Sequence, residues 1–89
     1  MNLLWYPDAW SDYLDWDEVD PSITTKINEL IKDISRSPLR GIGKPEPLRG
    51  DYAGWWARRI TGVHRLVYRI LGTGREQRIE VAACREHYK

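Results

Sequence analysis

The side chains best suited to chemistry in this sequence are one carboxylate, several arginines and one histidine. Glu46 lies between two prolines in the motif KPEP, and proline restricts both its own backbone and that of the residue before it. Arg59 and Arg65 follow in runs whose composition is typical of strands, and His87 lies near the end of the chain. A carboxylate on so stiff a backbone, opposite guanidinium groups, indicates either a salt bridge or acid–base chemistry on a phosphate.

This set of side chains suits cleavage of RNA without a metal ion. That reaction needs a base for the 2′-hydroxyl, cationic donors for the charge that develops on the phosphate, and an acid for the leaving oxygen. Glu46 can serve as the base, His87 as the acid, and Arg65 with Arg59 as a phosphate clamp. The same residue types also fit a Glu46 salt bridge and a merely exposed His87, so residue types alone leave both interpretations open.

Other kinds of site fit the sequence less well. The set lacks the ligand count of a metal site, and it lacks a serine or cysteine nucleophile paired with a base. Strand alternation places the single cysteine, Cys84, on the face opposite His87, and one cysteine excludes an intramolecular disulfide framework. The segment GIGKPEPL lacks the spacing of a phosphate-binding P-loop. We therefore expect neither a metal nor a cofactor.

Length and charge favour one small domain, residues 1–89, with a polyanionic partner. Residues 1–39 carry eight acids and three bases, whereas residues 40–89 carry eleven bases and five acids. A basic half of this kind is typical of a polyanion site, although the two halves could also neutralise one another. We see no signal peptide or membrane-length apolar run, and we expect a cytoplasmic protein.

The first half of the chain predicts a short strand followed by two helices. The apolar run at residues 2–6 reads as a strand, and Pro7 with Asp8 begins a helix with one aromatic face that carries Trp10, Tyr13 and Leu14. A second helix is expected to begin at Pro21, after the N-cap Asp20, and to continue to about Ser35. Its apolar stripe consists of Ile23, Ile27, Leu30, Ile31 and Ile34.

The second half alternates with a period of two and predicts three strands, at residues 55–61, 63–71 and about 77–88. The expected fold is α+β, with an antiparallel sheet in the order β-α-α-β-β-β and both helices on one face. Antiparallel pairing can bring Arg59, Arg65 and His87 to one side, within reach of Glu46. His64 points away from the Arg65 face, which favours a structural role.

Four motifs in this order resemble the YoeB toxins of the RelE/ParE superfamily over nearly the whole chain: KINELIKDISRSPLRGIGKPEPL, GWWARRIT, HRLVY and AACREHY. The resemblance implies a toxin of a type II toxin–antitoxin pair that cleaves mRNA in the ribosomal A site. It implies catalytic roles for Glu46, Arg65 and His87. The implied substrate contacts are Arg59, Arg49, Tyr88 and Lys44.

The same resemblance implies a YefM-type antitoxin, a homodimer, and contact with operator DNA only through the antitoxin. The sequence departs from the family pattern at Gly62-Val63, in the long LGTGREQ hairpin and at Lys89, which follows the substrate-stacking Tyr88. Two alternatives stay open: a non-catalytic toxin that binds DNA gyrase, as ParE-type relatives do, and a plain RNA-binding module. Retention of Glu46, Arg65 and His87 together argues against the first alternative.

Overall fold

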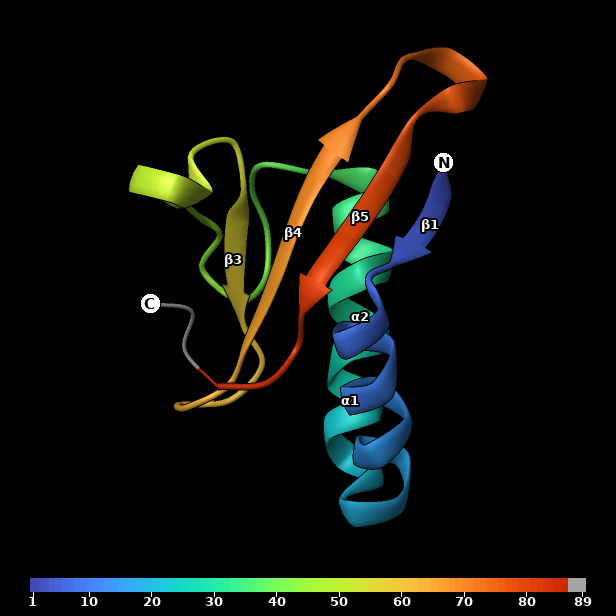
Figure 1. The fold of residues 1–89 in the computed structure, drawn as a ribbon, viewed down its shortest axis with the longest axis vertical. Coiled ribbons are helices and arrows are strands. Elements are labelled where there is room, and N and C mark those ends of the chain that lie inside the picture. The colour runs from blue at the N-terminus through green and yellow to red at the C-terminus, as the bar shows by residue number, and fades with distance from the viewer. Residues whose placement is uncertain (87–89) are drawn as a thin grey trace.

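The structure, a computed structural model, describes residues 1–86 of the chain and consists of a helical hairpin packed on a five-stranded sheet (Figure 1). The regular elements are β1 (Asn2–Trp5), α1 (Pro7–Val19), α2 (Pro21–Arg36), β2 (Glu46–Pro47), β3 (Trp56–Arg59), β4 (Arg65–Leu71) and β5 (Arg78–Ala83). Two 3-10 turns, η1 (Gly50–Tyr52) and η2 (Gly74–Glu76), lie in the connections. The strand order is β1-β5-β4-β3-β2, and the α+β fold class is confirmed.

The sheet is mixed rather than antiparallel, which corrects the expected topology. β1 pairs with β5 in parallel, with Leu3 opposite Ile79, while the other strand pairs are antiparallel. Alternation of side chains reports which residues share a face and carries no information on strand direction. β1 and β5 are also far apart in the sequence, so no tight turn forces them to be antiparallel.

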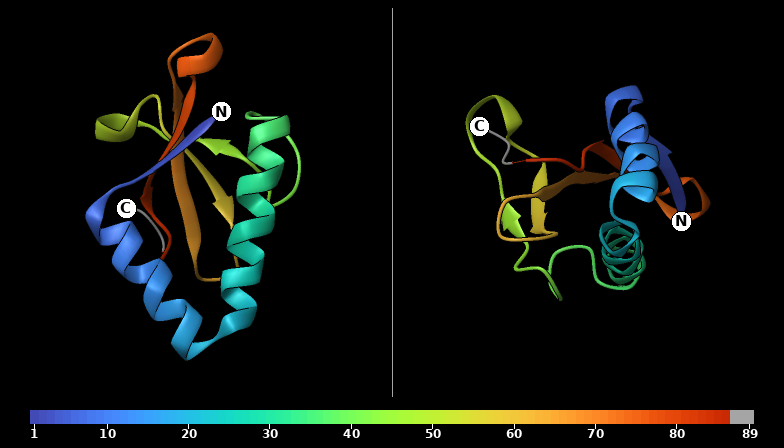
Figure 2. Two further views of the ribbon diagram at one scale, coloured as in Figure 1. Left: turned by 90° about the vertical axis from the view of Figure 1, so that its right-hand side faces the viewer. Right: turned by 90° about the horizontal axis from the view of Figure 1, so that it is seen from below.

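α2 is the helix that the sequence describes best. It begins at Pro21, after an N-cap Asp20 whose side chain accepts a hydrogen bond from the Ser22 amide, and it ends at Arg36. Ile27, Leu30 and Ile34 are fully buried against the sheet, as the periodicity predicts. Figure 2 shows the two helices as a V-shaped hairpin beside the sheet. None of the helices in residues 1–86 is long and apolar enough to cross a membrane.

The aromatic face of α1 is not the face that the helix buries. Trp10 and Leu14 are 44% and 49% exposed, and the helix buries Ala9 and Trp16 instead, with Tyr13 partly buried. Aromatic residues occur on several sides of this helix, so their presence does not identify the inner side. Ala9, Tyr13 and Trp16 are spaced at the helical period, and the side of the helix that carries them faces α2 and β5.

β5 is shorter than expected and contains an irregularity that changes which residues share a face. It ends at Ala83, and its register against β4 skips one residue, because Val67 lies opposite Ala83 whereas Tyr68 lies opposite Val81. An extra residue of this kind reverses the alternation beyond it. Cys84 consequently joins Val81 in the core, whereas strict alternation along this strand would place the two residues on opposite faces.

Candidate active site

Glu46 lies on a short paired strand rather than in an unpaired loop. In β2 it is opposite Ala57 of β3, and the Leu48 amide donates to the Trp55 carbonyl at 2.9 Å on one side of this pair. On the other side, the Arg59 amide donates to the Gly43 carbonyl at 2.7 Å. Backbone hydrogen bonds therefore add to the stiffness that the KPEP prolines impose.

Strand register places Glu46, Arg59 and Arg65 on the same face of the sheet. Ala57 is opposite both Glu46 and Val67, and Arg59 is opposite Arg65. Residues directly opposite in an antiparallel pair share a face, and so do residues two apart on one strand. This is the face that the helices do not cover, because the alternate residues of β3 and β4 pack in the core. The register thus puts Arg59 and Arg65 on one side, as expected, and adds Glu46 to the same face.

Within residues 1–86, the side chains of Glu46, Arg59 and Arg65 keep groups that are available to a ligand. Arg65 is half-buried and its Nη1 donates to the carbonyls of Thr61, Gly62 and His64 at 2.9, 3.3 and 3.1 Å, which braces the guanidinium against the β3–β4 turn. Arg59 and Glu46 are exposed, and neither forms an ion pair or side-chain hydrogen bond with residues 1–86. The alternative of a Glu46 salt bridge therefore finds no partner in this range.

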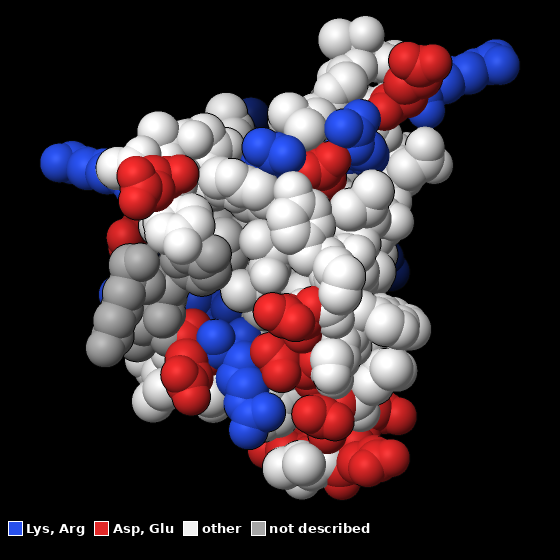
Figure 3. All heavy atoms as spheres, viewed as in Figure 1, with Lys and Arg blue, Asp and Glu red and all other residues white. Residues whose placement is uncertain are grey.

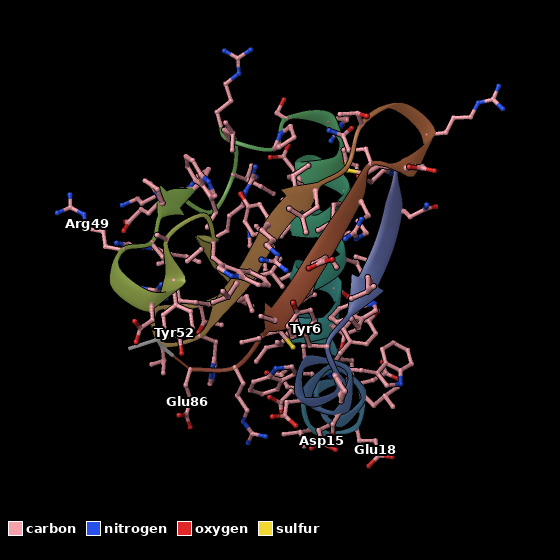
Figure 4. The ribbon with its side chains drawn as sticks, turned by 45° about the horizontal axis from the view of Figure 1, so that its top comes forward. Tyr6, Asp15, Glu18, Arg49, Tyr52 and Glu86 are labelled. Carbon is pink, nitrogen blue, oxygen red and sulfur yellow. The ribbon has the colours of Figure 1, made fainter. Side chains whose placement is uncertain are left out.

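Two further substrate-contact candidates lie near this group. Lys44 is exposed and has a φ of 51°, and it precedes Pro45 in the loop before β2. Arg49 is exposed, and Figure 4 shows it projecting into solvent beside η1. The other expected site residues, His87 and Tyr88, lie outside the described residues, so their roles remain predictions.

Arg58 is a site-supporting residue that the strand pattern did not single out. Its side chain is fully buried, and its guanidinium forms an ion pair with Asp33 of α2. The remaining N–H groups donate to the Tyr68 hydroxyl at 3.1 Å and to carbonyls of the segment after α2, those of Ser37, Pro38, Arg40 and Ile42. The hydrogen bond from Arg58 lowers the pKa of Asp33, which keeps the pair ionised.

The sequence did contain an indication that Arg58 is buried. Alternation places it on the same face as Ile60, the core face, and a buried arginine requires a charged partner and several acceptors. By these contacts Arg58 ties down the segment that leads from α2 to the KPEP motif, and thereby supports the position of Glu46.

The C-terminal segment is brought against the turn that carries Arg65. The Arg65 amide donates to the Glu86 carbonyl at 3.1 Å, and the Glu86 amide donates to Nδ1 of His64 at 2.8 Å. The Trp16 indole N–H donates to the Cys84 carbonyl at 3.0 Å. These contacts confirm the expected structural role of His64. They also place Glu86 beside the start of β4.

A pocket of about 420 Å³ lies beside the candidate site, lined by Tyr6, Pro7, Asp8, Asp51, Tyr52, Trp55 and Ala82. None of Glu46, Arg59 and Arg65 lines it, so we place the site by strand register rather than by this hollow. Acidic side chains cluster over α1 in the lower part of Figure 3, and basic side chains lie directly beside them. Residues 1–86 contain no group of histidine, cysteine and acidic side chains that could hold a metal ion.

Comparison with known proteins agrees with the resemblance seen in the motifs. Residues 5–88 match the family described as the YoeB-like toxin of bacterial type II toxin–antitoxin systems. The chain is also 51% identical over 88 residues to Toxin YoeB of Escherichia coli K12, which covers 99% of this chain and 100% of that relative. The chain belongs to the YoeB-like toxin family.

Solved structures of YoeB toxins share its fold. The YoeB/ParE toxin from Agrobacterium tumefaciens has a TM-score of 0.97 at 53% identity, covering 99% of this chain and 100% of that one. The YoeB dimer from Staphylococcus aureus has a TM-score of 0.86 at 42% identity, and the toxin in the heterotetrameric YoeB–YefM complex from the same organism has 0.88 at 40%. Each covers 99% of this chain and 98% of its own.

Proposed function

We propose that this YoeB-family toxin is a metal-independent endoribonuclease that cleaves mRNA in the ribosomal A site and so inhibits translation. One observation carries the proposal: the strand register gathers Glu46, Arg59 and Arg65 on the face of the sheet opposite the helices. Neither Glu46 nor Arg59 is neutralised by an ion pair in residues 1–86. A carboxylate left unpaired beside two arginines suits a general base facing a bound phosphate.

In the proposed reaction, Glu46 takes the proton of a ribose 2′-hydroxyl, and the 2′-oxygen attacks the adjacent phosphorus. Arg65 donates hydrogen bonds to the phosphate as negative charge builds up on its oxygens, and Arg59 assists it. The bond from phosphorus to the 5′-oxygen breaks, and His87 supplies a proton to that leaving oxygen. The products are a 2′,3′-cyclic phosphate and a free 5′-hydroxyl.

The bracing of Arg65 supports its proposed role. Three carbonyls already hold Nη1, while Nε and Nη2 have no partner in residues 1–86. A guanidinium fixed on one side meets a phosphate with little further loss of side-chain freedom, and preorganised donors contribute most to charge stabilisation. Lys44, Arg49 and Tyr88 are proposed to contact the substrate further from the scissile bond, Tyr88 by stacking on a base.

We further propose a YefM-type antitoxin as the cognate partner, contact with operator DNA only through that antitoxin, and a homodimer of the free toxin. The S. aureus structures, a YoeB dimer and a YoeB–YefM heterotetramer, support these assemblies. A ribosomal target implies a cytoplasmic location.

Translation of a defined mRNA with the purified chain tests the activity. We expect cuts within codons, only when ribosomes are present, and insensitivity to a metal chelator that leaves the ribosomes intact. Intact mRNA together with inhibited DNA supercoiling by gyrase would replace the proposal with a ParE-like, non-catalytic toxin. Intact mRNA with tight RNA binding would indicate a plain RNA-binding module.

A further inference from the structure

His64 lies between α1 and the C-terminal segment, and it contacts both. Its ring meets the Trp16 ring edge-on, with 4.7 Å between the centroids. Its Nδ1 accepts a hydrogen bond of 2.8 Å from the Glu86 amide. Trp16 itself is nearly buried and holds the Cys84 carbonyl through its indole N–H. The segment from Cys84 to Glu86 is therefore attached to α1 and to the β3–β4 turn.

From these contacts we infer that His64 is a positioning residue for the toxin's catalytic C-terminal segment. The inference concerns the same site as the proposed function, and its catalytic part depends on that function. Glu86 is held at both ends of its backbone, because His64 accepts from its amide and the Arg65 amide donates to its carbonyl. Residue 87, the proposed acid, is bonded covalently to the Glu86 carbonyl carbon. His64 and Arg65 therefore fix the backbone position to which the proposed acid is attached.

The backbone conformation of Glu86 indicates that these two hydrogen bonds stabilise the turn. Its φ is 61°, in the left-handed region, which is energetically unfavourable for a residue other than glycine. The Glu86 side chain is exposed and forms no hydrogen bond or ion pair with residues 1–86 that would offset this cost. The two backbone hydrogen bonds are the interactions that hold this turn, and His64 supplies one of them.

The direction of the hydrogen bond also specifies the chemical state of His64. A backbone amide only donates, so Nδ1 must be unprotonated, and the neutral ring carries its proton on Nε2. An asparagine at position 64 would offer its side-chain oxygen at the same distance from Cβ, whereas a phenylalanine would keep a ring against Trp16 and offer no acceptor. These two substitutions separate the hydrogen bond from the packing.

In the unaltered toxin, NMR supplies the first test. We expect a scalar coupling across the hydrogen bond between the Glu86 amide nitrogen and Nδ1 of His64, together with the chemical shifts of a ring protonated at Nε2. A ring protonated at Nδ1 would overturn the inference even if every variant failed to fold, because such a ring cannot accept from the amide.

The second test compares His64→Asn with His64→Phe. We expect slow hydrogen exchange at the Glu86 amide in the wild type and His64→Asn, and exchange faster by about tenfold or more in His64→Phe. On ribosomes programmed with mRNA, the single-turnover cleavage rate at saturating ribosome should fall about 10- to 100-fold in His64→Phe and recover in His64→Asn. Ribosome affinity should change little in either variant.

Equal exchange and equal cleavage in the two variants would overturn the positioning role, because packing against Trp16 would then be the whole contribution of His64. If the wild type does not cleave mRNA at all, the proposed function fails. The exchange of the Glu86 amide still decides the structural part of the inference in that case.

Discussion

The Arg58 guanidinium forms an ion pair with the Asp33 carboxylate of α2 while its own side chain is wholly shielded from solvent. The same guanidinium bonds the Tyr68 hydroxyl and several carbonyls of the segment that follows α2. A charge in the core thus connects the helical layer, the sheet and the segment that leads to Glu46. The geometry of the candidate site depends on this buried contact as well as on the exposed residues.

Replacing Arg58 by methionine should destabilise the fold strongly. The change leaves the Asp33 carboxylate without its partner and several carbonyls without donors, and loss of one member of a buried pair typically costs about 3 to 5 kcal/mol. Urea denaturation measures the free energy of unfolding. The matched control is Arg75→Met in the exposed η2 turn, for which we expect a change below about 0.5 kcal/mol. Similar losses in the two variants would show that the Arg58 contacts contribute no particular stability.

Acid should destabilise the protein through Asp33. The hydrogen bond from Arg58 lowers its pKa below the ordinary value of 3.8, so its stabilising contribution is complete above that value and is lost as the pH falls through the lower, folded pKa. Glu80 acts with the same sign: burial raises its pKa, but hydrogen bonds from Arg78 and Arg69 outweigh this effect and lower it overall.

The measurement is the free energy of unfolding between about pH 5 and pH 2 at constant ionic strength. Asp33→Asn should be less stable than the wild type near neutral pH and should lose less stability across this range. Asp15→Asn, on exposed α1, serves as the control and should keep the wild-type slope. A wild-type slope in Asp33→Asn would contradict the assignment.

Gly43 should tolerate no side chain. Its φ is 79°, and a Cβ would lie 2.8 Å from Cδ2 of Leu30 and 3.1 Å from the Arg59 carbonyl oxygen. We expect Gly43→Ala to lower the free energy of unfolding by about 1 to 3 kcal/mol and to disturb the backbone pairing beside Glu46. Gly62→Ala is the control, because no neighbouring atom lies within 4 Å of its Cβ. An equally small effect at both positions would argue against a tight approach at Gly43.

Cys84 should resist thiol reagents while the protein is folded. Burial, with a smaller effect of Asp12, raises the pKa of this thiol to about 12, and its side chain has no exposed surface. At about pH 8 the folded thiol should react about a thousandfold more slowly than the thiol of the urea-unfolded chain, as the loss of thiolate implies. Mass spectrometry counts the modified fraction, and Cys84 is the single cysteine. Rapid modification in native buffer would mean that the segment near β5 opens readily.

Local patterns predicted much of this fold, because each depends on only a few neighbouring residues. The α2 stripe and the alternation of β3 and β4 follow from periodicity, and the KPEP motif located Glu46 before any contact was known. Placing Arg59 and Arg65 on one face required only strand parity, and the register agrees. The short paired strand that brings Glu46 to the same face was not predicted, because the sequence was interpreted as a loop there. His87 and Tyr88 lie outside the described residues, and their assignment stays a prediction.

The features that the sequence did not predict all depend on long-range packing. The parallel direction of β1 depends on its pairing with β5, which lies near the other end of the chain, and the inner side of α1 depends on the contact of Trp16 with Cys84. One extra residue in β5 reversed the facing of the residues that follow it. Alternation within a single strand contains no sign of such a bulge.

In the proposed reaction, Glu46 acts as the base in cleavage of mRNA on the ribosome. The most direct test is the single-turnover cleavage rate of Glu46→Ala on programmed ribosomes, with Glu76→Ala in the exposed η2 turn as the matched control. We predict that Glu46→Ala lowers this rate by about 10² to 10⁴ with unchanged stability, and that Glu76→Ala retains the wild-type rate. A wild-type rate in a folded Glu46→Ala variant would contradict the account.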